Sequence, residues 1–199
     1  MLDNNRFLTK FQPHIYFLIT TLILLRMENQ PSTARSAIKW GLIIGVASIA
    51  FSTIIFLSGQ FGNQTLGYLG YLILIVGLVL AMKDFRTQNN GFMRYGQGLG
   101  LGSLISGVTG LLSGAFMYVY MAFVDTTLNE QLLDKAREQW EKQGMSEQQM
   151  EQAAEMSKTF MGPGVMFVFG VLGTLIFGVI LSLIIAAIMK KDPPVNEML

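Results

Sequence analysis

Four long stretches without a charged residue alternate with polar segments along the chain. Each has the ~17 residues or more that an apolar helix needs to cross a bilayer. Inside lipid the backbone N–H and C=O groups must find partners within the segment, and a helix satisfies them. The stretches lie at about 40–59, 66–82, 96–124 and 165–189. The pattern predicts an all-α membrane protein with four transmembrane helices.

The polar segments on the two sides of these spans differ in charge. Segment 125–164, between the third and fourth spans, holds eight acidic and four basic residues, and the link 60–65 is uncharged. Basic residues collect in the segments of the other side, at Arg35, Lys39, Lys83, Arg86, Arg94, Lys190 and Lys191. Because cytoplasmic segments of membrane proteins carry the excess of Lys and Arg, we expect both termini in the cytoplasm.

Segment 125–164 carries two patterns that start helices. Residues 127–130 and 146–149 each place a hydroxyl residue three positions before Glu or Gln, as in a capping box. Gly144 is suited to end the first of the two helices. We expect an extracytoplasmic helical hairpin between spans three and four, its apolar stripes facing each other or the membrane. Extension of the flanking transmembrane helices is an alternative that the pattern leaves open.

The first 26 residues do not fit the four-span pattern. The apolar run 15–25 is too short to cross a bilayer, and Arg26 stands where a signal peptide would need small residues for cleavage. We expect residues 1–26 to be an N-terminal extension, and an upstream start codon ahead of a usual start at Met27 is one explanation of it that the residues leave open. Residues 27–199 are expected to form a single four-span domain, with 125–164 as its outer insertion.

Small residues recur along the spans at helical spacing. The third span has one line with steps of four and three residues, and beside it a second line of Gly102, Ser106, Thr109 and Ser113. In lipid there is no hydrophobic drive between helices, and small faces let backbones pack closely. The predicted helix-packing residues are Gly41, Gly45, Gly96, Gly100, Ser103, Gly107, Gly110, Gly114, Gly170 and Gly178; the last two belong to a line in the fourth span with steps of four.

Candidate chemistry is sparse. The spans contain no Asp, Glu, Lys, Arg or His, and the chain has no cysteine. Ion-coupled transporters and membrane enzymes usually place an ionisable residue near their substrate. We therefore expect no enzymatic activity, no cofactor and no metal site. The hydroxyls of Ser103, Ser106, Thr109 and Ser113 either bond between packed helices, which is common in such interfaces, or line a narrow polar path.

Three segments carry a resemblance to a known family. They are Lys39-Trp40-Gly41-Leu42-Ile43 with Gly45, Tyr95-Gly96-Gln97 with Gly100, and residues 141–149 just before the last span. In these segments the chain, from Met27 onward, resembles a bacterial inner-membrane family known as domain of unknown function 4199. The resemblance implies four spans with an outer helical insertion in the bacterial inner membrane. It brings no catalytic motif with it.

Two functions fit these features. The first is a non-enzymatic scaffold or accessory subunit that associates through its small-residue helix faces. Its expected partners are membrane lipid and another membrane protein or a second copy of the chain. A net charge of +1, with basic and acidic residues on opposite sides, gives no reason to expect nucleic acid. The alternative is a passive channel or small-solute carrier that uses the serine and threonine line.

Overall fold

The computed structural model describes residues 32–60 and 63–194. These residues form six α-helices, one π-helical segment and no β-strand, and they belong to one compact unit, Thr33–Leu199. The elements are α2 (Thr33–Leu57), α3 (Gln64–Gln88), α4 (Tyr95–Val119), η1 (Tyr120–Val124), α5 (Leu128–Lys142), α6 (Glu147–Phe160) and α7 (Pro163–Met189). The expectations for residues 1–26 and for a start at Met27 lie outside the described residues.

Four of the helices are long and apolar enough to cross a membrane: Thr33–Leu57, Thr65–Gln88, Tyr95–Val124 and Pro163–Met189. The predicted all-α fold with four transmembrane helices is confirmed. Two helices continue beyond the apolar stretches, since α2 begins at Thr33 and α3 runs past Met82 to Gln88. Charge ends an apolar span, whereas it does not interrupt the backbone hydrogen bonds of a helix.

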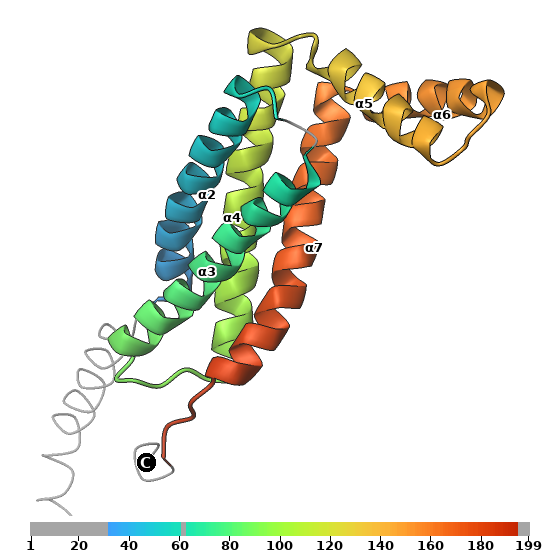
Figure 1. The fold of residues 1–199 in the computed structure, drawn as a ribbon. Coiled ribbons are helices and arrows are strands. Elements are labelled where there is room, and N and C mark those ends of the chain that lie inside the picture. Colours follow the sequence, from blue (N-terminus) through green and yellow to red (C-terminus); the bar gives the residue numbers. More distant parts are fainter. Residues whose placement is uncertain (1–31, 61–62, 195–199) are drawn as a thin grey trace, which may run out of the picture. The chain divides into compact units, whose positions relative to one another are not determined.

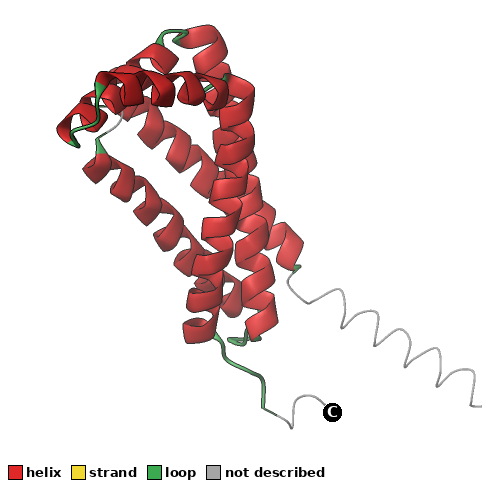
Figure 2. Cartoon of the chain, turned by 90° about the vertical axis from the view of Figure 1, so that its right-hand side faces the viewer, coloured by secondary structure: helices red, strands yellow, loops and turns green. Residues whose placement is uncertain are grey.

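Helix α4 lies in the middle of the bundle, with α2 on one side and α7 on the other (Figure 1). Its contacts with α7 are the most extensive between any two elements, and those with α2 come next. Helix α3 crosses the bundle at a slant and packs mainly against α2. Figure 2 shows that the described elements are helices joined by short links.

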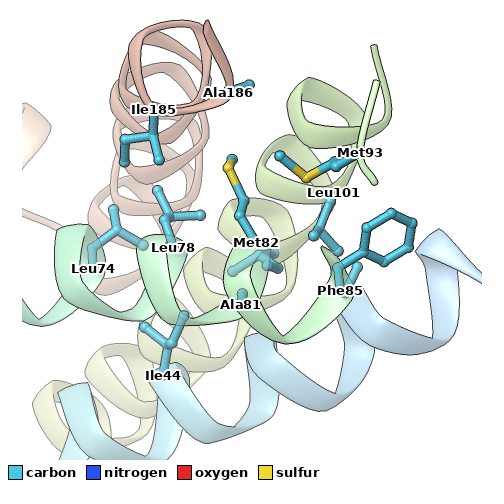
Figure 3. Close-up of a cluster of buried hydrophobic side chains, with 12 residues drawn as sticks. Ile44, Leu74, Leu78, Ala81, Met82, Phe85, Met93, Leu101, Ile185 and Ala186 are labelled. Carbon is cyan, nitrogen blue, oxygen red and sulfur yellow. The ribbon is translucent and has the colours of Figure 1, made fainter. Parts of the chain in front are cut away.

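The buried apolar core lies toward one end of the bundle, near the α3–α4 link. Figure 3 shows Leu78 of α3 and Ile185 of α7 pointing toward each other, with Ile44 of α2 pointing toward α3 from its other side. The complete set of buried residues in this cluster is Ala37, Ile44, Leu74, Leu78, Ala81, Met82, Phe85, Met93, Leu101, Ile105, Ile185 and Ala186. The first half of α3, by contrast, leaves large side chains such as Tyr68 and Leu72 exposed.

Polar contacts tie the helices together at this same end. Asp84 of α3 accepts hydrogen bonds on Oδ2 from Lys39 Nζ at 3.0 Å and from Trp40 Nε1 at 2.7 Å. After α7, Lys191 pairs with Met93 through two backbone hydrogen bonds of 2.8 and 2.9 Å. The basic segments before α2, after α3, before α4 and after α7 therefore meet at one end of the bundle.

Helices α5 and α6 contact each other, and non-helical residues separate them from the spans at 125–127 and 161–162. The predicted capping box at Ser146 is present: Ser146 Oγ accepts from Gln149 N, and Gln149 Oε1 accepts from Ser146 N at 2.9 Å. The one predicted at Thr127 is wrong. Thr127 has helical backbone angles (φ −89°, ψ −7°) instead of the extended ones of an N-cap, and its side chain makes no cap hydrogen bond; its N–H and its hydroxyl both donate to Asp125 Oδ1.

Replacement of Asp84 by alanine should destabilise the bundle more than replacement of Lys39. Asp84→Ala removes an acceptor that serves two donors, and hydrogen bonds to charged groups contribute about 1.5–3 kcal/mol each. Lys39→Ala breaks one pair whose lysine is 55% exposed, which should cost about 0–1 kcal/mol. Denaturant titration of the purified protein in detergent measures both. Equal losses of stability in the two variants would contradict a larger contribution of Asp84 than of Lys39.

Candidate association surface of the helix bundle

The contact between α4 and α7 is built from small residues at every fourth position of both helices. The two helices run in opposite directions, so the positions pair in reverse order. The pairs are Gly98 with Ala186, Gly102 with Ser182, Ser106 with Gly178, and Gly110 with Thr174. We call this contact the α4–α7 seam.

At the middle of the seam, two Gly-x-x-x-Ser segments pack reciprocally. Ser106 of α4 lies on Gly178 of α7, and Ser182 of α7 lies on Gly102 of α4. A Cβ added at Gly102 would lie 2.7 Å from Ser182 Cβ, closer than side chains approach. Each serine hydroxyl donates to the glycine carbonyl one turn earlier in its own helix, Ser106 to Gly102 at 2.8 Å and Ser182 to Gly178 at 2.6 Å. Both serines are fully buried, and both hydroxyls are satisfied.

Toward both ends of the seam, α4 and α7 remain in close contact. A Cβ added at Gly98 would lie 2.9 Å from Ala186 Cβ, and one at Gly110 would lie 3.2 Å from the carbonyl oxygen of Val171. At Gly114 it would lie 3.0 Å from Val171 Cγ2. Gly110, Gly114 and Gly178 of the predicted packing set therefore lie in the seam.

Helix α2 packs on another face of α4 through two further predicted glycines. A Cβ at Gly41 would lie 2.6 Å from Val108 Cβ, and one at Gly45 would lie 3.0 Å from Leu112 Cδ2. The hydroxyl of Thr109 donates across this contact to the carbonyl oxygen of Gly41 at 3.3 Å. Close approach of α2 and α4 therefore depends on Gly41 and Gly45.

The remaining predicted glycines do not take part in packing among the described residues. Gly96, Gly100 and Gly170 have no heavy atom within 4 Å of an added Cβ, and Gly107 has only the tip of Leu175, at 3.9 Å. The reason on α4 is rotational: the seam follows positions 98, 102, 106, 110 and 114, whereas the first part of the predicted line, from Gly96 to Gly107, lies on another side of the helix and meets the seam only at Gly110. We call Gly96, Gly100, Ser103 and Gly107 the open face of α4.

The four hydroxyls of the predicted polar path are placed differently from one another. Ser103 Oγ donates to Leu99 O at 2.8 Å, while Ser106 and Thr109 are engaged in the two packing contacts and are buried. Ser113 Oγ is buried and has no hydrogen-bond partner among the described atoms. Three of the four hydroxyl protons are therefore used by backbone carbonyls, and of these bonds only that of Thr109 joins two helices. A path for solutes stays a prediction.

The packing residues predicted from the sequence do not include Gly98 and Gly102. The signal that could have found them is the strict step of four from Gly98 through Gly102, Ser106, Gly110 and Gly114. The same step recurs on α7 from Gly170 to Ala186. Two antiparallel helices can pair such lines along their whole length only when both have the same period.

Ionisable side chains gather outside the seam, on α5 and α6. A surface cleft is lined by Asp134, Arg137, Glu138, Glu141, Glu147, Met150 and Glu151. Within residues 32–60 and 63–194, no group of three or more His, Cys, Asp or Glu is arranged to hold a metal ion. Arg137 lies 3.7 Å from Asp134, as expected for charges on an exposed helix surface.

A bundle of four long apolar helices joined through small-residue faces defines a multi-pass integral membrane protein. Comparison with protein families gives a more specific assignment. The family model described as "Protein of unknown function (DUF4199)" matches residues 39–191, which is most of the chain. The chain belongs to this family, and the predicted resemblance is confirmed. No curated protein and no solved structure matches the chain.

Alanine at Gly102 and alanine at Gly100 should have opposite effects on stability. Gly102→Ala forces a Cβ onto Ser182, and overpacking of this kind costs about 1–3 kcal/mol. Gly100→Ala meets no atom within 4 Å and removes a helix-interior glycine, so it should be neutral or stabilise by up to about 1 kcal/mol. Denaturant titration in detergent measures both variants.

The double variant Gly102→Ala with Ser182→Gly tests the cause of that loss. It removes the side chain with which the new Cβ collides, so it should recover a large part of the stability lost by Gly102→Ala alone. A double variant no more stable than Gly102→Ala would show that the loss does not come from the seam.

Proposed function

We propose that this protein is a non-enzymatic scaffold or accessory subunit that binds another membrane protein, or a second copy of itself, through the open face of α4. The observation that supports this proposal is the difference between the two small stripes of α4. One stripe is used in the seam, and the other lies unused on the surface of a helix that crosses the membrane.

A stripe of glycine that packs against nothing lowers the stability of its helix. Glycine in a helix interior destabilises it by roughly 0.5–1 kcal/mol relative to alanine, and no contact within the described chain offsets this at Gly100. A partner helix that packs on the open face would repay it through close backbone contacts. Ser103 lies in the middle of this face, with its hydroxyl bonded to Leu99 O, so a partner meets no unsatisfied proton there.

The proposal also specifies a location, the bacterial inner membrane with both termini in the cytoplasm. It is supported by the meeting of the basic segments at one end of the bundle and by the acidic balance of segment 125–164, which is attached to the other end. In membrane proteins the cytoplasmic segments carry the excess of Lys and Arg, and this supports a cytoplasmic basic end.

Leucine on the open face should break association and leave the fold intact. In the variant with Gly96→Leu and Gly100→Leu, two bulky side chains would hold a partner helix away from α4, and association should weaken about tenfold or more. Neither side chain meets an atom of the described chain within 4 Å of its Cβ. The readout is the size distribution of complexes extracted from native membranes into nanodiscs without detergent.

Gly67→Leu is the matched control, since Gly67 is also exposed on a spanning helix and has no atom within 4 Å. It should leave the size distribution unchanged. Unchanged complexes in the open-face variant would refute association through this face. Flux of small neutral solutes into liposomes that contain the protein distinguishes the alternative, because a scaffold gives none and a passive channel or carrier gives a measurable rate.

The proposed orientation predicts which sites are accessible from outside intact cells. Since the chain has no cysteine, single cysteines can be introduced without background. Glu138→Cys in α5 should react with a membrane-impermeant maleimide, whereas Lys83→Cys at the basic end should react only after the membrane is opened. The reverse pattern would invert the proposed topology.

A further inference from the structure

One apolar surface outside the four spans has no function in the fold. It is a groove on α6 lined by Ala153, Met156, Ser157, Phe160 and Met161. Met156 is 67% exposed and Phe160 is 54% exposed, although α6 is otherwise polar on its surface. Only Ala154 of α6 is buried, on the part of the helix that α5 covers.

The exposed apolar residues of α6 lie on one face. Ala153, Met156 and Phe160 follow the three- and four-residue steps that place side chains on one stripe of a helix. Glu151 and Glu155 lie on the opposite stripe, and both are exposed. The helix is therefore amphipathic in its exposed part, with a hydrophobic edge beside an acidic surface.

This apolar edge is continuous with a lipid-facing surface of the bundle. The rings of Phe160 and Phe169 meet edge to face with their centroids 6.2 Å apart. Phe169 is 59% exposed on α7, next to Val168, which is also exposed, and both belong to a spanning helix. Only Met161 and Gly162 separate α6 from Pro163, the first residue of that span.

The length of α6 determines how it can meet the membrane. Its 14 residues cover about 21 Å as a helix, less than the ~30 Å of hydrocarbon, so α6 cannot span. An amphipathic helix that does not span and that adjoins a spanning helix has its lowest free energy in the interfacial layer, with its apolar edge among the acyl chains. The acidic cleft between α5 and α6 then faces water.

From the exposed edge, its ring contact with Phe169 and its short link to α7, we infer that α6 is a membrane-interface helix. Met156 and Phe160 enter the lipid leaflet at the end of the bundle where α7 begins, and they fix the position of the helical segment against the membrane. The occupant of the groove is lipid of the same membrane. This role is independent of the open face of α4.

The test uses the full chain in nanodiscs that hold one copy each, made of phosphatidylcholine and phosphatidylglycerol. Spin labels are attached to single cysteines at Met156→Cys and Phe160→Cys, with Glu151→Cys and Glu155→Cys as controls on the opposite stripe. Accessibility to oxygen, which concentrates in lipid, should exceed accessibility to a water-soluble nickel complex at 156 and 160. The order should reverse at 151 and 155.

Two results would overturn the inference. Nickel accessibility at 156 and 160 equal to that at 151 and 155 would place the whole helix in water. Exclusion of both reagents at 156 and 160 would mean that protein covers the groove, and with one copy per disc that protein is this chain itself. If a label lowers the unfolding temperature, brominated lipid can be used with Phe160→Trp and Glu155→Trp: the quenching of each variant beyond that of the native Trp40 and Trp140 should be larger at 160 than at 155.

Discussion

The structure depends on the reciprocal contact between Gly102-x-x-x-Ser106 and Gly178-x-x-x-Ser182. In water, two helices associate because they remove apolar surface from solvent, but lipid tails are as apolar as leucine and give no such drive. The remaining attraction is van der Waals contact between closely spaced atoms, and it is strongest where the backbones of two helices come close together. Each serine lies on the glycine of the other helix, so both close approaches occur at once, and the hydroxyls bond within their own helices.

The position of α4 follows from this requirement. Each of the two contacts of α4 needs a stripe of small residues on one of the two helices. In the contact with α7 the stripe lies on α4, from Gly98 to Gly114, and in the contact with α2 it lies on α2, at Gly41 and Gly45. Helix α3 packs on α2 through Gly77, where an added Cβ would collide with the side chain of Ile44, and on the bundle through larger side chains such as Leu78 and Met82; its buried positions begin at Leu74. Asp84 adds a polar tie at the end where that packing is concentrated.

The sequence alone predicts the spans well, because membrane thickness and the cost of charge in hydrocarbon act on every residue independently of its partners. It also predicts the cap at Ser146, where the signal is local. It did not identify the seam, because a line with steps of four and three and a line with steps of four each follow one side of a helix, and only the position of α7 decides which of them is used. Thr127 shows the same limit at short range, since its hydroxyl donates to the carboxylate of Asp125 and forms no cap on α5.

The two surfaces with unassigned function differ in a way that follows from their solvents. In hydrocarbon, a glycine stripe interacts with lipid no more favourably than a leucine stripe would. It stabilises the protein only where another helix packs closely against it. Outside the spans, exposure of a methionine and a phenylalanine to water is unfavourable, and transfer of these side chains into lipid removes that cost without a protein partner. For this reason we propose a protein partner for the open face of α4 and the membrane itself for the groove of α6.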